Sequence, residues 1–98
     1  MNLQTVDPKK IDYAAEIFKG FGNPIRIRII DALRAKSLRV MELSEMLGLP
    51  QPIISQQLKI LKSAGIVQKV REEGNFCYRL TNNHFSDMIK CMRGCLGL

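Results

Sequence analysis

The chain has 98 residues, of which 46% are hydrophobic and 24% are charged, a mix typical of one soluble globular domain spanning residues 1–98. Its 15 Lys and Arg residues outnumber 9 Asp and Glu residues, and this formal net charge of +6 favours a polyanionic partner. No apolar run approaches the roughly 20 residues of a membrane helix, and MNLQTVDPKK lacks the pattern of a signal or transit peptide. Because 3 cysteines cannot all pair within one chain, we expect a cytoplasmic protein with reduced thiols and no membrane partner.

The first part of the chain predicts two helices. Apolar side chains recur at i, i+3, i+4 and i+7 between Ile11 and Phe18, which is the spacing of one helix face. Asn23 followed by Pro24 indicates a helix start, because an Asn side chain caps free N–H groups and proline fits the first helical position. Ile and Arg alternate after this cap, but the cap favours a helix over residues 24–35, which we expect to be buried and central.

A second pair of helices is joined by a very short turn. Residues 40–47 (VMELSEML) form an amphipathic pattern that ends at Gly48, and residues 53–64 (IISQQLKILKSA) form another that ends at Gly65. The residues between them, 49–52, are expected to form the turn. Two helices joined by so short a turn, the second of them basic, are typical of a helix-turn-helix.

The remaining residues predict a β-hairpin and a last helix. Residues 66–71 and 76–80 flank a glycine-containing connection over residues 72–75. Alternation along the second strand predicts that Cys77 points outward, and the residues expected to face inward are Phe76, Tyr78 and Leu80. Helical periodicity returns over residues 83–96. The order helix, helix, helix, helix, strand, strand, helix predicts a mainly α winged helix-turn-helix.

The helix over residues 53–64 separates into two faces at about 100° per residue. The face that we expect to pack against the domain contains Ile53, Ile54, Leu58, Ile60, Leu61 and Ala64. The polar face contains Pro52, Ser55, Gln56, Lys59, Lys62 and Ser63. Gln can bond an adenine edge, Ser several base edges, and Lys a phosphate or a guanine, so this face suits the major groove of DNA. A solvated face on a protein-binding module is the alternative.

Acidic residues are missing from the whole of this region. Residues 46–71, between Glu45 and Glu72, contain no carboxylate. A surface that binds DNA phosphates explains the absence of carboxylates better than a basic surface that only faces water. We therefore expect double-stranded DNA as the partner. The candidate DNA-binding residues are Gln51, Pro52, Ser55, Gln56, Gln57, Lys59, Lys62, Lys69 and Arg71.

Three stretches, GNPIRIRIIDAL, VMELSEMLGLPQPIISQQLKILKSAGIV and NFCYRL, resemble the ArsR/SmtB family of bacterial and archaeal repressors, and the resemblance covers residues 14–95. It implies a homodimer formed by the first and last helices, binding to a palindromic operator, repression, and release when a metal ion, metalloid or other small signal binds. It also implies that Ser55, Gln56 and Gln57 lie where the family contacts DNA. The residues expected in the dimer interface are Phe85, Ile89, Met92 and Leu96 with Ile11, Ala14 and Phe18.

The β-hairpin over residues 66–80, which forms the wing of a winged helix-turn-helix, departs from the family pattern. Many members have a basic wing tip, whereas this chain has Glu72 and Glu73 beside Gly74. We therefore do not expect the tip to enter the minor groove. The candidates for phosphate contact from the wing are Lys69, Arg71 and Arg79.

Two sensor sites of the family are absent from the sequence. One is a Cys-x-Cys at the start of the first helix of the helix-turn-helix, where this chain has residues 40–43, VMEL. The other needs a cysteine in the second helix of the chain, which has none. The family's last-helix metal site corresponds by resemblance to Asn82, His84, Cys95 and Leu98, of which two can ligate well.

The last helix carries soft ligands along one sector, namely His84, Met88, Cys91 and Cys95. Cys91 and Cys95 are one turn apart, but His84 lies roughly 16 Å from Cys95 along the axis. Antiparallel last helices in a dimer would bring His84 of one subunit near Cys95 of the other. One interpretation of this pattern is a site for arsenite, Cd or Zn at His84, Cys91 and Cys95. The alternatives are structural thiols, since free cysteine and methionine fill cores and interfaces, and redox sensing.

Two classes of function other than a repressor are an enzyme and a binding module for protein or RNA. An enzyme with Cys91 or Cys95 as nucleophile is not expected, because the chain has one histidine, no Gly-rich phosphate loop and no clustered carboxylates. A winged-helix module that binds protein or RNA and has no sensory site is the remaining alternative.

Overall fold

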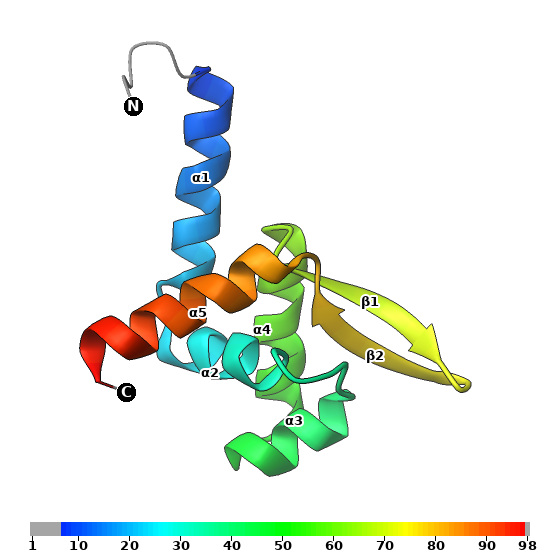
Figure 1. Ribbon diagram of the computed structural model, residues 1–98. Coiled ribbons are helices and arrows are strands. Elements are labelled where there is room, and N and C mark those ends of the chain that lie inside the picture. Colours follow the sequence, from blue (N-terminus) through cyan, green and yellow to red (C-terminus); the bar gives the residue numbers. More distant parts are fainter. Residues whose placement is uncertain (1–6, 98) are drawn as a thin grey trace.

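The computed structural model describes residues 7–97, where four helices precede a two-stranded hairpin and one further helix (Figure 1). The elements are α1 (Pro8–Phe21), α2 (Pro24–Ala32), α3 (Val40–Leu47), α4 (Gln51–Ser63), β1 (Val67–Glu72), β2 (Asn75–Leu80) and α5 (Asn83–Leu96). This order confirms the predicted winged helix-turn-helix. Within residues 7–97, no helix is both long enough and apolar enough to span a membrane.

Side-chain caps define the starts of several helices. The Asn23 side chain accepts a hydrogen bond from the backbone N–H of Ile25 at 2.9 Å, which confirms the expected start of α2. The end of α2 differs from the expected residue 35, because the helix stops at Ala32. Leu33 is buried beyond this end, and the chain must turn there so that residue 38 can pair with the hairpin.

The core is formed where α2 and α4 cross beneath the hairpin and α5. The buried residues of the cluster are Ile17, Ile29, Ile30, Leu33, Leu38, Leu43, Leu47, Ile54, Leu58, Leu61, Ile66, Val67, Phe85 and Ile89. The central position expected for α2 is confirmed by Ile29 and Ile30, which are inaccessible to solvent. Burial of side chains of this size stabilises the fold by about 1.5–3 kcal/mol each.

Helix α4 differs from its expected bounds and packing. It begins at Gln51, inside the expected turn, because proline at residue 52 needs no N–H partner in the first turn of a helix. Of the face expected to be packed, Ile54, Leu58 and Leu61 are buried, but Ile53 and Ile60 are 36% and 40% exposed. The expectation for these two isoleucines was wrong, because only the stripe at i, i+4 and i+7 meets the core.

The hairpin is tighter than expected. Its strands pair antiparallel from Val67 opposite Leu80 to Glu72 opposite Asn75, so only Glu73 and Gly74 form the turn. Both turn residues have positive φ, 51° and 79°, which is the type I′ geometry that matches the twist of the strands. The expected four-residue connection therefore contributes its first and last residues to the strands.

The faces of β2 follow the predicted alternation in part: Tyr78 and Leu80 pack against the core as expected, whereas Phe76 and Cys77 do not follow it. Cys77 is buried and Phe76 is 54% exposed, so the expectation of an outward Cys77 was wrong. The cause lies outside the hairpin, where Leu38 pairs with Tyr78 through hydrogen bonds of 3.0 and 2.8 Å. This added strand segment covers the middle of β2, while the tip beyond it extends into solvent (Figure 1).

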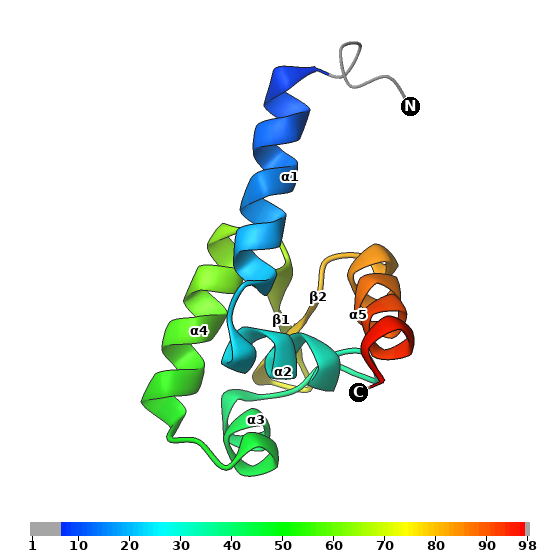
Figure 2. The same ribbon diagram turned by 90° about the vertical axis from the view of Figure 1, so that its left-hand side faces the viewer.

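Helices α1 and α5 lie at the periphery, and α1 projects from the rest of the molecule (Figures 1 and 2). Of α1, only Ile17 and Gly20 are buried. On α5, Phe85 and Ile89 are buried within the same chain, which contradicts their expected place in a dimer interface. They pack inward because α5 closes the core over α2 and β2.

Candidate nucleic-acid interface

Helix α4 lies along one edge of the molecule (Figure 2), and its polar residues are exposed to solvent. The exposed residues on this helix include Gln51, Pro52, Ser55, Gln56, Lys59, Lys62 and Ser63. None of the residues of α4 is acidic. The face therefore combines amide, hydroxyl and ammonium groups without a carboxylate, a set that can bond base edges and phosphates.

Two side chains hold the turn that sets the angle between α3 and α4. Gly48 ends α3 with φ of 68°, a left-handed conformation that glycine adopts without strain. The Ser44 hydroxyl donates to the carbonyl of Leu49, and Arg28 Nη2 donates to the carbonyl of Leu47 at 3.0 Å. The start of α4 is thereby connected to α2 and α3.

Gln57 differs from its neighbours on α4. It is half buried, and its Oε1 accepts a hydrogen bond from Nη1 of Arg26 at 3.0 Å. The structure therefore does not group Gln57 with the fully exposed Ser55 and Gln56. The partner, Arg26, was missed by the sequence analysis, although the alternation of Ile and Arg on a helix was a visible signal that the arginines have packing partners.

The wing places two cations on one exposed ring. Lys69 Nζ lies 4.3 Å and Arg71 Cζ 5.0 Å from the centroid of Phe76. At the tip, the Ser37 hydroxyl donates to Glu72 Oε1 at 3.1 Å. Lys69 and Arg71 thus lie along the strands, whereas the tip of the hairpin is acidic. The sequence analysis did not predict that the Phe76 ring would contact these two cations.

Charged contacts join α5 to α2 away from this surface. Asp31 accepts hydrogen bonds from Arg34 at 3.0 Å and from Nε of Arg93 at 3.2 Å. The bond from Arg93, together with the bond from Arg34, lowers the pKa of Asp31 below its usual 3.8 despite partial burial, and the same contact raises the pKa of Arg93.

The structure places two of the three tentative sensor residues together. Cys91 and Cys95 are exposed on α5, and a side-chain hydrogen bond with Cys95 raises the pKa of Cys91. His84 is exposed at the other end of the helix. Within residues 7–97, no three His, Cys, Asp or Glu side chains are grouped closely enough to hold a metal ion. Leu98, the fourth position of the resemblance, lies outside the described residues.

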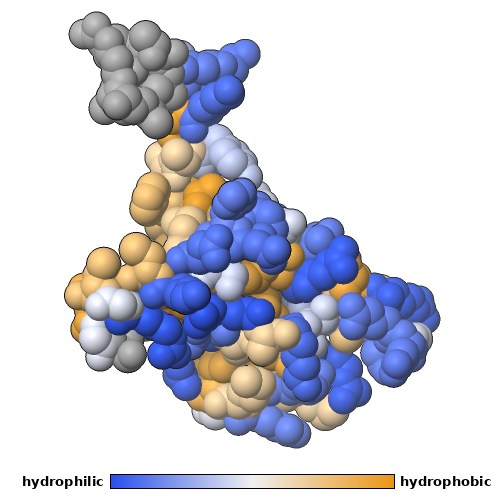
Figure 3. Space-filling view, viewed as in Figure 1, coloured by the Kyte–Doolittle hydropathy of each residue, from blue (hydrophilic) through white to orange (hydrophobic). Residues whose placement is uncertain are grey.

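An apolar cavity of about 370 Å³ separates α1 from α5. It is lined by Phe18, Phe21, Met88, Cys91 and Met92. Hydrophobic residues also gather on α1 and at the C-terminal end of α5 in the space-filling view (Figure 3). Of the thiol pair, Cys91 lines this cavity, and no residue of α4 does.

Comparison with known proteins places this fold among transcription regulators. The HlyU structure from Vibrio cholerae superposes with a TM-score of 0.82 at 28% identity, covering 94% of this chain and all of that one. The HTH-type transcriptional repressor SmtB of Mycobacterium tuberculosis is 40% identical over 83 residues, which are 84% of this chain and 62% of that protein. The chain therefore spans less than two thirds of the length of SmtB.

A shorter relative is matched over nearly its whole length. An HTH-type transcriptional regulator of Methanocaldococcus jannaschii is 45% identical over 85 residues, covering 84% of this chain and 93% of the relative. The family model described as bacterial regulatory protein, arsR family, matches residues 23–69, which contain α2, the complete helix-turn-helix and the start of β1. Because the likeness extends over both the sequence and the fold that presents α4, this chain belongs to the ArsR family of regulatory proteins.

Proposed function

We propose that the protein is a homodimeric, sequence-specific DNA-binding transcriptional repressor. The observation that carries this proposal is the exposed face of α4, which has hydrogen-bonding and cationic side chains and no acid. The major groove admits a helix of this kind, and base edges there present the donors and acceptors that Gln and Ser can pair with.

The exposed residues divide into two roles by chemistry and position. Gln51, Pro52, Ser55 and Gln56 lie in the first half of α4, which in helix-turn-helix proteins meets the bases. The phosphate-binding set comprises Lys59 and Lys62 on α4 and Lys69, Arg71 and Arg79 on the wing. Gln57 acts through its bond to Arg26 as well as through any contact with DNA.

Dimerisation through α1 and α5 is supported by the apolar groups they leave uncovered. Ile11, Phe18 and Leu96 are 45%, 67% and 66% exposed, values that a second copy of the chain would lower. A two-fold dimer would present two α4 helices to the same side of a duplex and so select a palindromic operator.

Selection of duplexes from a random library tests this function. Labelled duplexes of about 30 base pairs are long enough for two half-sites. We expect the protein to enrich an inverted repeat and to bind it in fluorescence anisotropy at least about 1000-fold more tightly than a scrambled duplex. Equal affinity for all duplexes contradicts the proposal. Tighter binding to single-stranded RNA, or no binding to nucleic acid, favours the alternative of an RNA- or protein-binding module.

A second proposal concerns a soft ion at α5. Cys91 and Cys95 supply two thiols one turn apart, a donor pair suited to arsenite, Cd²⁺ or Zn²⁺. The described residues of one chain place no His, Asp, Glu or further Cys with this pair, so His84 of the partner subunit would complete the site. Bound ion would displace thiol protons and change the dimer geometry, which releases the operator if the ion binds the DNA-free state more tightly.

The double substitution Cys91→Ser with Cys95→Ser tests the soft-ion site. We expect it to bind the selected operator normally and to lose the response to arsenite, Cd²⁺ and Zn²⁺ that the wild type shows under reducing conditions. Cys77→Ser is the matched control, because Cys77 is buried in the wing and distant in the chain from the pair. A wild type that ignores all three ions contradicts the sensor and leaves the DNA-binding proposal standing.

A further inference from the structure

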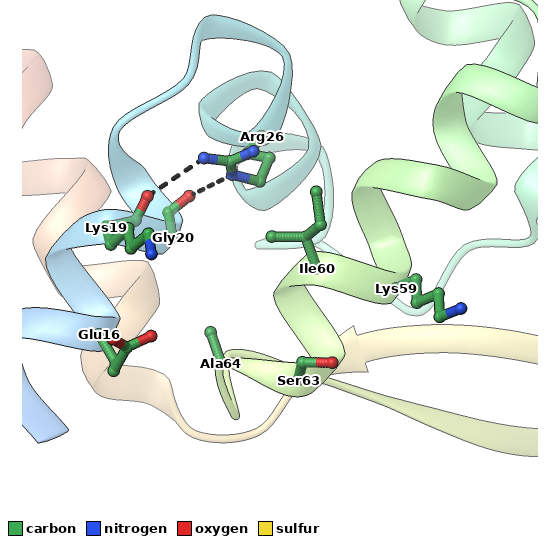
Figure 4. Close-up of a pocket in the computed structure, with 8 residues that line it drawn as sticks. All are labelled: Glu16, Lys19, Gly20, Arg26, Lys59, Ile60, Ser63 and Ala64. Atoms are coloured by element: carbon green, nitrogen blue, oxygen red, sulfur yellow. Dashed lines mark hydrogen bonds between the residues drawn. The ribbon is translucent and has the colours of Figure 1, made fainter.

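Arg26 binds the end of α1 with two of its donors. Its Nε donates to the carbonyl of Gly20 at 2.9 Å, and its Nη2 donates to the carbonyl of Lys19 at 3.2 Å (Figure 4). These carbonyls belong to the last turn of α1, where helix acceptors lack intrahelical partners, although the Lys19 carbonyl also accepts from the N–H of Gly22 at 3.1 Å. Arg26 therefore donates hydrogen bonds to the C-terminal carbonyls of α1, the helix that we propose contributes to the dimer interface.

The third donor of the same guanidinium reaches the recognition helix. Nη1 of Arg26 donates to Oε1 of Gln57 at 3.0 Å, between residues that are 31 positions apart in the chain. Both side chains are half buried, so this bond is shielded in part from competing water. Because a guanidinium is planar and its donors are rigidly spaced, α1 and α4 are held in one relative orientation.

The bond also orients the amide of Gln57. Arginine has donors and no acceptor, so Gln57 must turn its oxygen toward Arg26. One lone pair of Oε1 is then occupied, and the NH₂ group remains to donate to a guanine or thymine acceptor or to a phosphate. The bond to Arg26 therefore fixes the direction of the amide and favours donation over the two-sided pairing of a glutamine with adenine.

A close backbone contact connects the same two helices. A Cβ atom built on Gly20 would lie 2.4 Å from Cδ1 of Ile66 and 3.6 Å from Cβ of Ala64. The last turn of α1 is therefore seated directly against the end of α4 and the residue that precedes β1. Beyond it, a groove of about 490 Å³ separates the helices, and its lining consists of Glu16, Lys19, Gly20, Arg26, Lys59, Ile60, Ser63 and Ala64 (Figure 4). Arg26 and Gly20 are thus the points of attachment between the helices.

We propose that Arg26 is a positioning residue for DNA reading: it couples the orientation of the recognition helix to α1 and fixes the orientation of the Gln57 amide. This inference rests on the proposed function, since it requires that α4 reads DNA and that α1 contributes to the dimer. A helix cap alone would need only the bonds to Lys19 and Gly20; the bond to Gln57 adds the coupling.

The test compares Arg26→Met, Gln57→Met and the double variant on the wild-type-selected duplex and on its scrambled form. We expect each single variant to lower the ratio of the two affinities roughly tenfold, which corresponds to about one good base contact. We expect the double variant to have the same affinity ratio as the less selective of the two single variants. The reason is that each single substitution already removes the one interaction between Arg26 and Gln57. Affinity for the scrambled duplex and the dimer fraction in sedimentation should change less than about twofold.

Arg34→Met is the matched control, because the guanidinium of this arginine bonds Asp31 and Ser86 and makes no hydrogen bond to the described residues of α1 or α4. Arg26→Lys should recover part of the selectivity, because an ammonium can make one of the three bonds. If Arg26→Met does not fold, Gln57→Met still removes the coupling and leaves the cap of α1 in place. Its thermal unfolding then verifies that the fold is retained.

The outcomes separate this inference from the proposed function. A wild type that selects no duplex overturns both. A selective wild type with equally selective Arg26→Met and Gln57→Met variants overturns the positioning role alone and leaves Arg26 as a cap. Additive losses in the double variant also overturn it, because they show that the two residues act separately.

Discussion

Neighbouring polar residues on α4 are expected to do different chemistry. Gln56 and Lys59 are both exposed and three residues apart, so they lie on the same side of the helix. An amide can distinguish one base from another, whereas an ammonium attracts any phosphate. Their substitution should therefore separate specificity from general affinity.

Gln56→Ala should lower affinity for the selected operator by about 1–3 kcal/mol and leave affinity for a scrambled duplex unchanged. Lys59→Ala should weaken both and reduce the slope of log affinity against log salt by about one. Anisotropy titrations over a salt series measure these effects. Ser63→Ala, an exposed position at the last residue of α4, is the control. Unchanged affinity in both test variants would contradict this placement of the recognition face.

Asp31 makes stability depend on pH. Its pKa is lowered in the folded state by the hydrogen bonds from Arg93 and Arg34. The stability that it contributes is therefore fully present above its unfolded value and is lost as pH falls through the lower folded value. We expect Asp31→Asn to be less stable than the wild type at pH 7 by on the order of 1 kcal/mol, because the pair is partly exposed.

This difference should shrink as the pH falls below about 4 and through the lowered folded-state pKa of Asp31, because the wild-type carboxylate becomes protonated. Urea unfolding at a series of pH values measures it. Asp87→Asn is the matched control, because it removes an exposed carboxylate of α5 that makes no ion pair within residues 7–97. A constant difference between Asp31→Asn and wild type across the series would show that Asp31 acts through packing.

At the scale of elements, α1 presents a face that the chain does not cover. Phe18 is 67% exposed beside the cavity between α1 and α5, so a charge there costs little in a monomer and much in an interface. We expect Phe18→Glu to sediment as a monomer while its thermal unfolding changes little. Met46→Glu is the control, because Met46 is 59% exposed on α3 and lies outside this face. A dimeric Phe18→Glu variant would refute the interface.

Met92 is a less direct probe of the same interface. It is half buried and packs against the core, in contact with both the α1–α5 cavity and a second cavity that Ile27 and Ile89 line. Met92→Glu should therefore lower both the dimer fraction and the stability of the fold. Substitution of the exposed Phe18 is the cleaner test, because it should lower the dimer fraction without lowering the stability of the fold.

The hairpin turn carries conformational strain at one residue. Glu73 adopts φ of 51° ahead of Gly74, a conformation that Asn tolerates much better than Glu. We expect Glu73→Asn to stabilise the protein by about 1 kcal/mol in urea unfolding. Glu73→Gln removes the same charge without relieving the strain and is the matched control. Equal gains in both variants would assign the effect to charge.

At the scale of the whole molecule, the distance between two recognition helices determines which operators a dimer can bind. Half-sites of helix-turn-helix dimers are centred one helical turn, about 10–10.5 base pairs, apart. Inserting about five base pairs between the half-sites turns one of them to the opposite side of the duplex. We expect the affinity for this operator to fall to that for a single half-site.

The same insertion outside both half-sites should leave affinity unchanged, and gel-shift titration measures both. Retained affinity after the central insertion would show that each subunit binds independently. Such a result would contradict the proposal that dimerisation through α1 and α5 sets the spacing of the two α4 helices on DNA.

The sequence by itself determined the order of the elements and several of their ends. Asn23 and Pro24 mark the start of α2, and Gly48 marks the end of α3. These signals act through bonds and contacts within about four residues, so a short stretch contains them completely. The acid-free surface of α4 was predictable for the same reason, because a helix presents its residues in a known angular order.

Only the tertiary structure decided which faces remain free. Cys77 is buried because Leu38, far away in the chain, pairs beside it, and Phe85 faces inward because α5 closes over α2. The bond between Arg26 and Gln57 likewise joins distant residues. Each depends on which elements come together in space, and periodicity within one element cannot distinguish a face that packs on its own chain from one that awaits a second copy.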